Sequence, residues 1–203
     1  MTGADVRFRA DRFEILRTRT PKAIAGDDFR LASVLAPIQE RPDGDYLILT
    51  LRAKNLSSHS GQVAFPGGSV DPDDDGPVAT ALRETHEEIG IDPDHVHVLG
   101  QLDEVFAGYN FLVTPFVGLI PYPYEFRPDP RETAAVFSVP VAALLKQDAL
   151  TLDYRLSRRS EPIYHFQYEE WDIWGATARM VKQLLELVYG YRSPGRLETK
   201  DEG

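Results

Sequence analysis

Residues 67–91 read GGSVDPDDDGPVATALRETHEEIGI: a glycine pair, an acidic loop and then a segment with helical periodicity. Pro77 suits the first turn of a helix, with Gly76 or Asp75 as its cap, and Gly90 is a typical helix end. The apolar positions recur at helical spacing on one face: Val78, Ala81, Leu82, Ile89 and the methyl group of Thr85. The stretch therefore predicts an amphipathic helix over residues 77–90 that follows a Gly-Gly turn.

Three carboxylates, those of Glu84, Glu87 and Glu88, fall within an arc of roughly 100° on a different face of this helix. A glutamate-rich face is usually solvated surface, but side chains crowded this closely repel one another unless a cation lies among them. Arg83 is spaced to brace Glu87, and Gly67-Gly68 offers bare backbone oxygens just before the helix. Because all the ligands are oxygens, the pattern favours Mg²⁺ or Mn²⁺ and, with it, a phosphate-bearing substrate.

The segment resembles the signature of Nudix hydrolases, Gly-x5-Glu-x7-Arg-Glu-U-x-Glu-Glu-x-Gly-U, where U is a bulky apolar residue. The matching positions are Gly68, Arg83, Glu84, Glu87, Glu88, Gly90 and Ile91. The loop is one residue longer than the general pattern, Asp74 stands where a glutamate is expected, and Thr85 replaces an aliphatic residue. A longer loop of this form is typical of one branch, the coenzyme A pyrophosphatases.

A second motif upstream resembles the additional signature of that branch, Leu-Leu-Thr-x-Arg-Ser/Ala-x3-Arg-x3-Gly-x-Val-x-Phe-Pro-Gly-Gly. The matches are Thr50, Arg52, Ala53, Gly61, Val63, Phe65, Pro66, Gly67 and Gly68. Ser57 departs from it, because the pattern has an arginine there. The loss of that cation affects the expected substrate more than the expected hydrolytic chemistry.

The resemblance implies a role for each matching residue. Glu84, Glu87, Glu88 and the Gly68 carbonyl are the expected metal ligands, and Arg83, Glu87 and Glu104 form the expected catalytic set. Either Glu87 or Glu104 is the general base, and the sequence leaves that choice open. For the substrate we expect contacts from Arg52, Lys54, Gln62 and Tyr109, although each also has an ordinary interpretation as a surface or scaffold residue.

Composition is compatible with a small-molecule enzyme. The 203 residues are 42% apolar, which is enough for the core of one domain, and the net charge of −10 argues against broad nucleic-acid binding. The absence of cysteine excludes disulfides and a Cys nucleophile. The first ten residues do not resemble a signal peptide, and no apolar run reaches the roughly 18 residues of a membrane helix. We expect a cytoplasmic protein without membrane partners. The aromatic segment 164–174 and the basic N-terminal arm could serve a homodimer.

Three regions are expected: an N-terminal arm over residues 1–29, partly ordered, with a helix near 11–18; a hydrolase domain over 30–190; and a polar tail over 191–203. Strands are predicted at 31–38, 46–52, 63–65, 96–105, 111–120 and 133–139, with a hairpin turn at 41–45, a short helix at 139–147, a hairpin at 149–168 and a last helix at 175–189. Helices on a mixed sheet fit the α/β/α sandwich that the resemblance implies.

Three functions are compatible with these motifs. The first is Mg²⁺- or Mn²⁺-dependent cleavage of coenzyme A or its derivatives to 3′,5′-ADP and 4′-phosphopantetheine. The second keeps the chemistry but changes the substrate to ADP-ribose, NADH or a nucleoside triphosphate. The third is a binding module without catalysis, which the intact Glu84, Glu87 and Glu88 disfavour.

Overall fold

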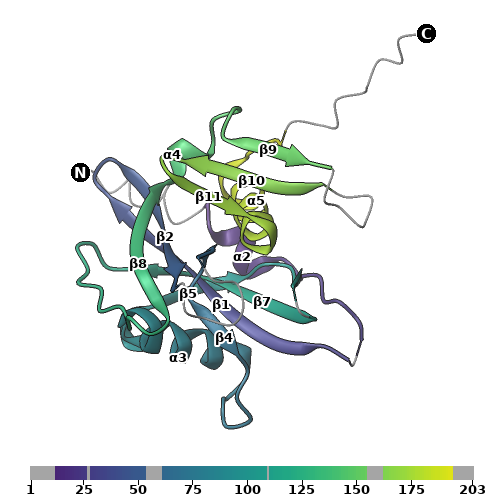
Figure 1. Cartoon of the computed structure of the whole chain (residues 1–203), viewed down its shortest axis with the longest axis vertical. Coiled ribbons are helices and arrows are strands. Elements are labelled where there is room, and N and C mark those ends of the chain that lie inside the picture. Colours follow the sequence, from purple (N-terminus) through teal and green to yellow (C-terminus); the bar gives the residue numbers. More distant parts are fainter. Residues whose placement is uncertain (1–11, 27, 54–60, 109, 155–161, 194–203) are drawn as a thin grey trace.

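A mixed β-sheet lies at the centre of the molecule (Figure 1). The computed structural model describes residues 12–26, 28–53, 61–108, 110–154 and 162–193. β1 (Arg30–Arg41) and β2 (Gly44–Arg52) form the predicted antiparallel hairpin, and β7 (Phe111–Ile120) runs parallel to β1. β8 (Thr133–Pro140) pairs antiparallel with β2. The short strands pair antiparallel with their neighbours: β3 (Val63–Ala64), β4 (Gly67–Ser69), β5 (His97–Gln101) and β6 (Val105–Ala107).

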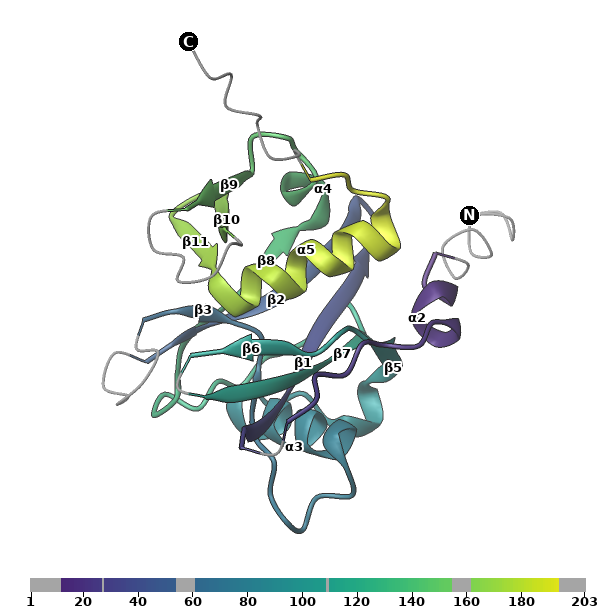
Figure 2. The same cartoon turned by 90° about the vertical axis from the view of Figure 1, so that its right-hand side faces the viewer.

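Two long helices cover opposite faces of this sheet, α3 (Pro77–Ile89) on one side and α5 (Gly175–Tyr189) on the other (Figure 2). Both faces of the sheet carry apolar side chains that must be buried, and β2 is an example. Successive side chains of a strand point to opposite faces. Leu47 and Leu49 enter a large apolar cluster on the α5 side, Ile48 enters a smaller one on the α3 side, and all three are fully buried. The predicted α/β/α sandwich with a mixed central sheet is therefore confirmed.

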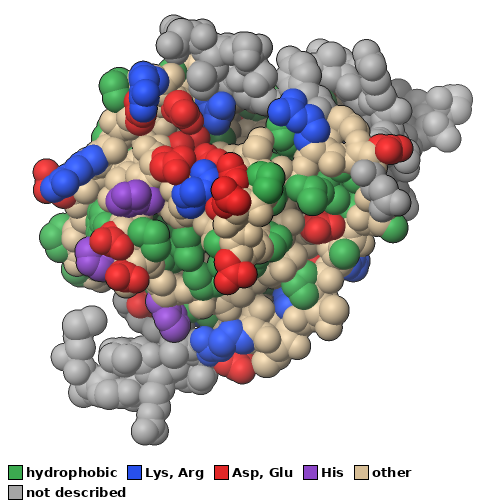
Figure 3. Space-filling model, turned by 90° about the horizontal axis from the view of Figure 1, so that it is seen from below, with side chains coloured by type: hydrophobic (Ala, Val, Ile, Leu, Met, Phe, Trp, Pro, Cys, Tyr) green, Lys and Arg blue, Asp and Glu red, His purple; other side chains and the backbone are tan. Residues whose placement is uncertain are grey.

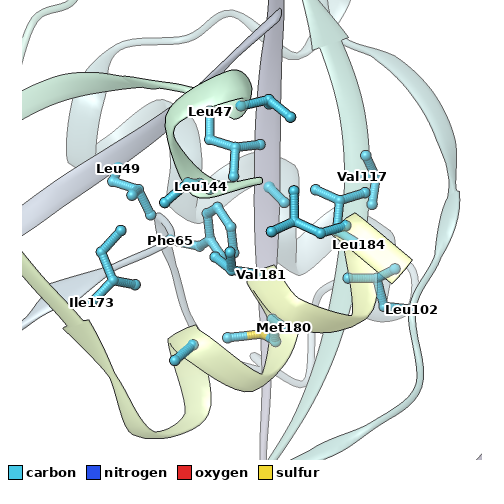
Figure 4. Close-up of a cluster of buried hydrophobic side chains, with 14 of the residues drawn as sticks. Leu47, Leu49, Phe65, Leu102, Val117, Leu144, Ile173, Met180, Val181 and Leu184 are labelled. Atoms are coloured by element: carbon cyan, nitrogen blue, oxygen red, sulfur yellow. The ribbon is translucent and has the colours of Figure 1, made fainter. Parts of the chain in front are cut away.

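The larger cluster joins the sheet to the C-terminal part of the chain (Figure 4). Val181 and Leu184 of α5 are fully buried there, as the helical spacing of apolar residues in this segment predicted. Phe65, which lies just before the glycine pair, belongs to the same cluster. Burial of these side chains thus fixes the position of α5 relative to the segment that leads into α3.

A second, three-stranded sheet precedes α5 and consists of β9 (Leu150–Asp153), β10 (Ile163–Tyr168) and β11 (Trp171–Trp174). The predicted hairpin corresponds to β9 and β10, and the short α4 (Val141–Leu144) lies before it. The helix predicted at 175–189 is α5, and residues 171–174 before it, where no strand was predicted, form β11. Ile173 pairs with Phe166 of β10, and both side chains are completely buried, so packing draws this segment into the sheet.

Two further expectations need correction. The glycine pair is not a simple turn, because Gly67–Ser69 form β4 and pair with residues 32–34 of β1. The single strand expected at 96–105 is divided into β5 and β6, and a short 3-10 helix (Pro93–His95) precedes β5. The division falls at Asp103 and Glu104, whose carboxylates accept hydrogen bonds from the backbone N–H groups of Lys22 and Ile24. The N-terminal segment is therefore attached at the point where the strand is interrupted.

The described part of the N-terminal segment contains α2 (Glu14–Thr18), which is shorter than the predicted helix. Arg12 connects this segment to the sheet, because its guanidinium donates to Glu40 at 2.8 Å and to Asp45 at 2.6 Å. Tyr189 of α5 donates to the same Asp45 at 2.9 Å. These bonds tie the N-terminal helix, the β1–β2 hairpin and α5 together. None of the helices in the described residues has the length and apolar character needed to cross a membrane.

Candidate active site

The glycine pair lies directly against two carboxylates of α3. The Gly67 N–H donates a hydrogen bond to Glu88 Oε2 at 3.1 Å. A Cβ added to Gly68 would lie 2.3 Å from the carboxylate carbon of Glu84, closer than any side chain could approach. The predicted proximity of bare backbone to the acidic helix face is therefore present, and it is achieved by the pairing of β4 with β1.

The three glutamates of α3 have different environments. Glu88 is 3% exposed, and Glu84 is largely buried one helical turn away. The side chain of Glu87 is 57% exposed and accepts a hydrogen bond from the Arg83 Nη1 group that also donates to Glu84. Burial raises the pKa of the Glu88 carboxyl to about 7, against the opposing effects of the Gly67 hydrogen bond and the Arg52 charge. Burial also raises the pKa of Glu84. Two buried carboxyl groups with raised pKa values mark the chemically unusual point of this helix.

Arg83 hydrogen-bonds three carboxylates in and next to this helix. Its guanidinium binds Asp74 through Nε and Nη2 at 2.8 and 2.9 Å, and Nη1 donates to Glu84 at 2.9 Å and to Glu87 at 3.2 Å. Thr80 and the Asp71 N–H also donate to Asp74. The pKa of Asp74 is held far below its usual range by the hydrogen bonds from Arg83, then those from Thr80 and Asp71. Asp74, which departs from the family pattern, thus anchors the arginine that orients Glu84.

The surface on the α3 side reflects this arrangement. Figure 3 shows several acidic side chains gathered on this face around interspersed basic ones. Local pairing of this kind limits repulsion in a chain whose net charge is −10.

A cavity of about 880 Å³ opens beside the buried pair, and Glu84, Glu88, Gly67 and Gly68 form part of its wall. Arg52 also lines it, with Nη1 at 3.5 Å from Glu88 Oε1, and so does Gln62. Two of the four expected substrate contacts therefore share the cavity with three of the four expected metal ligands, Glu84, Glu88 and Gly68. The other two, Lys54 and Tyr109, lie outside the described residues, as does Ser57.

Glu104 lies elsewhere. Its Oε2 accepts a hydrogen bond from the Ile24 N–H at 2.7 Å, and Oε1 accepts one from Thr114 at 3.4 Å. It lines a separate cavity of about 810 Å³ between the N-terminal segment and α5. In this structure Glu104 fastens the N-terminal segment, and the structure does not bring it to the cavity that contains Glu84 and Glu88.

A different acidic residue, Glu132, reaches that cavity from the loop before β8. Its negative charge contributes to the raised pKa values of both Glu84 and Glu88. Backbone bonds hold the loop against α3, since the Asp129 N–H donates to the Glu88 carbonyl at 2.9 Å and the Arg127 N–H to the Ile89 carbonyl at 2.8 Å. Sequence reasoning missed Glu132 because no spacing or motif connects the segment PDPRE to the acidic helix.

The donor set at the buried pair fits a hard divalent cation. It comprises two carboxylates and the adjoining Gly68 backbone, all oxygen ligands, in a space that a Cβ at Gly68 would fill. Within the described ranges, no three Asp, Glu or His side chains are grouped closely enough to form a complete site on their own. The protein therefore offers an incomplete shell that leaves room for water or substrate oxygens, which is usual for Mg²⁺.

Comparison with known proteins shows which family the chain resembles. The NUDIX domain family matches residues 30–159. A Nudix hydrolase named NudL from Photorhabdus laumondii, described as uncharacterized, is 40% identical over 179 residues, which cover 88% of this chain and 95% of the relative. A NudL protein from Yersinia pestis is 41% identical over 160 residues, which cover 78% of this chain and 80% of the relative.

A solved structure, a MutT/nudix family protein from Enterococcus faecalis, shares the fold. Its TM-score is 0.55 at 15% identity, with 93% of this chain and 75% of that chain covered. The acidic helix and the glycine pair lie within the part of the chain that the family matches. The chain is therefore a member of the Nudix family of hydrolases.

Proposed function

We propose that this chain is a Nudix hydrolase of the coenzyme A pyrophosphatase branch, which cleaves the diphosphate bond of coenzyme A or its derivatives to 3′,5′-ADP and 4′-phosphopantetheine. One observation carries the proposal: residues of the upstream motif and of the acidic helix line the same cavity. The motif contributes Arg52, Val63 and Phe65, and the helix contributes Glu84 and Glu88. A substrate bound in this cavity would contact the motif typical of the branch, and this supports the proposal.

Glu84, Glu88 and the Gly68 backbone would hold Mg²⁺ or Mn²⁺. When bound, such an ion supplies charge neutralisation of the diphosphate and makes a neighbouring water easier to deprotonate. Arg83 keeps the Glu84 carboxylate in place through its bonds to Asp74. Arg52 contributes a guanidinium that can pair with a phosphate oxygen when Glu88 is engaged with the cation.

The reaction is a hydrolysis. The oxygen of a water molecule forms a bond to one phosphorus atom, the bond from that phosphorus to the bridging oxygen breaks, and a carboxylate accepts the proton of the water. Among the three acids considered for the proton, Glu132 lines the cavity, whereas Glu87 is exposed beside Arg83 and Glu104 binds the N-terminal segment. We therefore propose Glu132 as the general base.

The test is a substrate panel. The purified chain is incubated with Mg²⁺ or Mn²⁺ and, in parallel, coenzyme A, ADP-ribose, NADH and nucleoside triphosphates, with the products separated by chromatography. Selective release of 3′,5′-ADP from coenzyme A supports the proposal. Preference for another diphosphate contradicts the substrate assignment but keeps the chemistry, and inactivity on every compound with the metal bound points to a binding module.

A further inference from the structure

The substrate cavity continues beyond the acidic helix to the C-terminal part of the chain. Its wall includes Ile163 of β10, Trp174 at the end of β11, and Thr177 and Met180 of α5. β10, β11 and α5 all follow residue 159, where the match to the family ends. One wall of the cavity is therefore built by a segment that the matched family region does not include.

This wall differs chemically from the carboxylate end. Ile163, Trp174 and Met180 are apolar or aromatic, and Phe106 and Phe111 of the β6–β7 hairpin continue the apolar lining, while Arg179 of α5 adds one charged side chain. A volume of about 880 Å³ lies in the range of pockets that enclose a whole organic ligand and is much larger than a diphosphate group requires. The cavity thus offers charged groups for a diphosphate and, next to them, apolar surface for something attached to it.

Trp174 is held in place as part of this wall. It is 38% exposed although its side chain is large and mostly apolar. Its ring stacks on the cross-strand partner His165, with the ring centres 6.1 Å apart and an angle of 11° between the planes. His165 Nδ1 lies 3.1 Å from both carboxylate oxygens of Asp172, which fixes the imidazole. A supported and accessible indole is suited to covering an apolar group of a ligand.

We propose that the segment formed by β10, β11 and α5 binds the apolar arm of a diphosphate substrate, with Trp174 and Ile163 as specificity-determining residues. This inference rests on the proposed function and extends it, because it names the residues that would discriminate among substrates by their arm, for example among acyl thioesters of coenzyme A. Glu84 and Glu88 would then hold the diphosphate end through a bound divalent cation, and the C-terminal wall selects the arm. Trp174 and Ile163 contribute to binding and not to bond cleavage.

Binding measured without turnover tests the inference independently of the hydrolysis. Calorimetric titration of the full chain with Ca²⁺ in place of Mg²⁺, with chromatography to check that each ligand stays intact, compares coenzyme A, acetyl-coenzyme A, octanoyl-coenzyme A and ADP-ribose. Affinity is expected to rise with acyl length, by about fourfold at most for each methylene buried. Trp174→Ala and Ile163→Ala are each expected to weaken octanoyl-coenzyme A about tenfold and to leave ADP-ribose nearly unchanged.

Gln167→Ala is the matched control, because Gln167 lies exposed on β10 and is not part of the cavity wall. Thermal unfolding checks that each variant folds. If loss of the stacked indole disturbs β11, Ile163→Ala still tests the same wall from β10. Undetectable binding of octanoyl-coenzyme A, affinity independent of acyl length, or equal losses on ADP-ribose would overturn the inference. A wild-type chain that shows arm-dependent binding but hydrolyses nothing would instead refute the proposed function alone.

Discussion

The backbone of Gly68 and the carboxylate of Glu84 are in such close contact that a single methyl group on the glycine would overlap the acid, at 2.3 Å from its carboxylate carbon. Gly67, the preceding residue, is confined differently, since a Cβ there would lie 2.3 Å from the Ser33 carbonyl oxygen and 2.5 Å from the Val34 Cα. One glycine therefore borders a side chain that can rotate, and the other borders the backbone of β1.

This contrast predicts different outcomes for two neighbouring substitutions. Gly68→Ala should displace the Glu84 carboxylate and reduce kcat/KM about 100-fold, because displacements of about 1 Å at a catalytic group have effects of that size. The fold should tolerate it. Gly67→Ala, at a φ of 151°, should destabilise the protein by about 1–3 kcal/mol. Kinetics and thermal unfolding of both variants check this, and a severe loss of stability in Gly68→Ala would contradict it.

Removal of either buried carboxylate should abolish most activity. Glu84→Gln and Glu88→Gln each remove a charge that the cation requires, and losses of about 100-fold or more in kcat/KM are expected. The fold should survive, since burial already disfavours the charged form of both groups. Glu87→Gln is the comparison within the same helix and should lose less than about tenfold, because Glu87 is exposed. Mn²⁺ affinity measured by calorimetry should follow the same order. Full activity of Glu84→Gln would refute the metal assignment.

The two candidate bases outside the helix can be separated. Glu132→Gln should lower kcat about 100-fold with little change in KM, because it removes a proton acceptor and leaves the metal ligands intact. Glu104→Gln should affect the attachment of the N-terminal segment, where Glu104 accepts from Ile24, and leave kcat within about fivefold. Steady-state kinetics and the pH–rate profile of both variants decide the matter. The reverse order of effects would restore Glu104 as the base.

Stability should depend on pH through Asp74. Its pKa in the folded protein lies below that of the unfolded chain, chiefly because Arg83 hydrogen-bonds the carboxylate. The stabilisation is therefore fully present above the unfolded pKa near 4 and is lost as the pH falls through the lower folded value. Asp74→Asn should lower Tm at pH 7, and the difference from wild type should narrow progressively below about pH 4. A difference in Tm that stays constant from pH 7 to pH 3 would contradict this account.

Local signals in the sequence predicted the elements that local interactions determine. Pro77 and Gly90 bound α3, and the turn at 41–45 joins β1 to β2, because capping and turn formation depend on neighbouring residues. The strand formed by Gly67–Ser69 was not predicted, since its partner is β1 and glycine has no strand preference of its own. Likewise, β11 depends on Phe166 and Ile173 meeting in the core.

The candidate site shows the same contrast between residues that local patterns predict and residues that only the tertiary structure brings together. Spacing along one helix was sufficient to predict Glu84 and Glu88, and the upstream motif was sufficient to predict Arg52 and Gln62 at the cavity. Spacing did not reveal that Glu87 is exposed and does not line the cavity, although it shares Arg83 with Glu84. Glu132 and the C-terminal wall enter the cavity from distant parts of the chain, and only the tertiary arrangement brings them there.

The backbone bonds from Arg127 and Asp129 to the end of α3 have a consequence for how this enzyme could change. They join the loop that carries Glu132 to the helix that carries Glu84 and Glu88. The proposed proton acceptor and the proposed metal ligands are therefore held in a fixed relative position. The wall proposed to contact the substrate arm belongs to a separate sheet and helix. Mutations there can redirect the enzyme to new substrates while the cleavage apparatus is inherited intact.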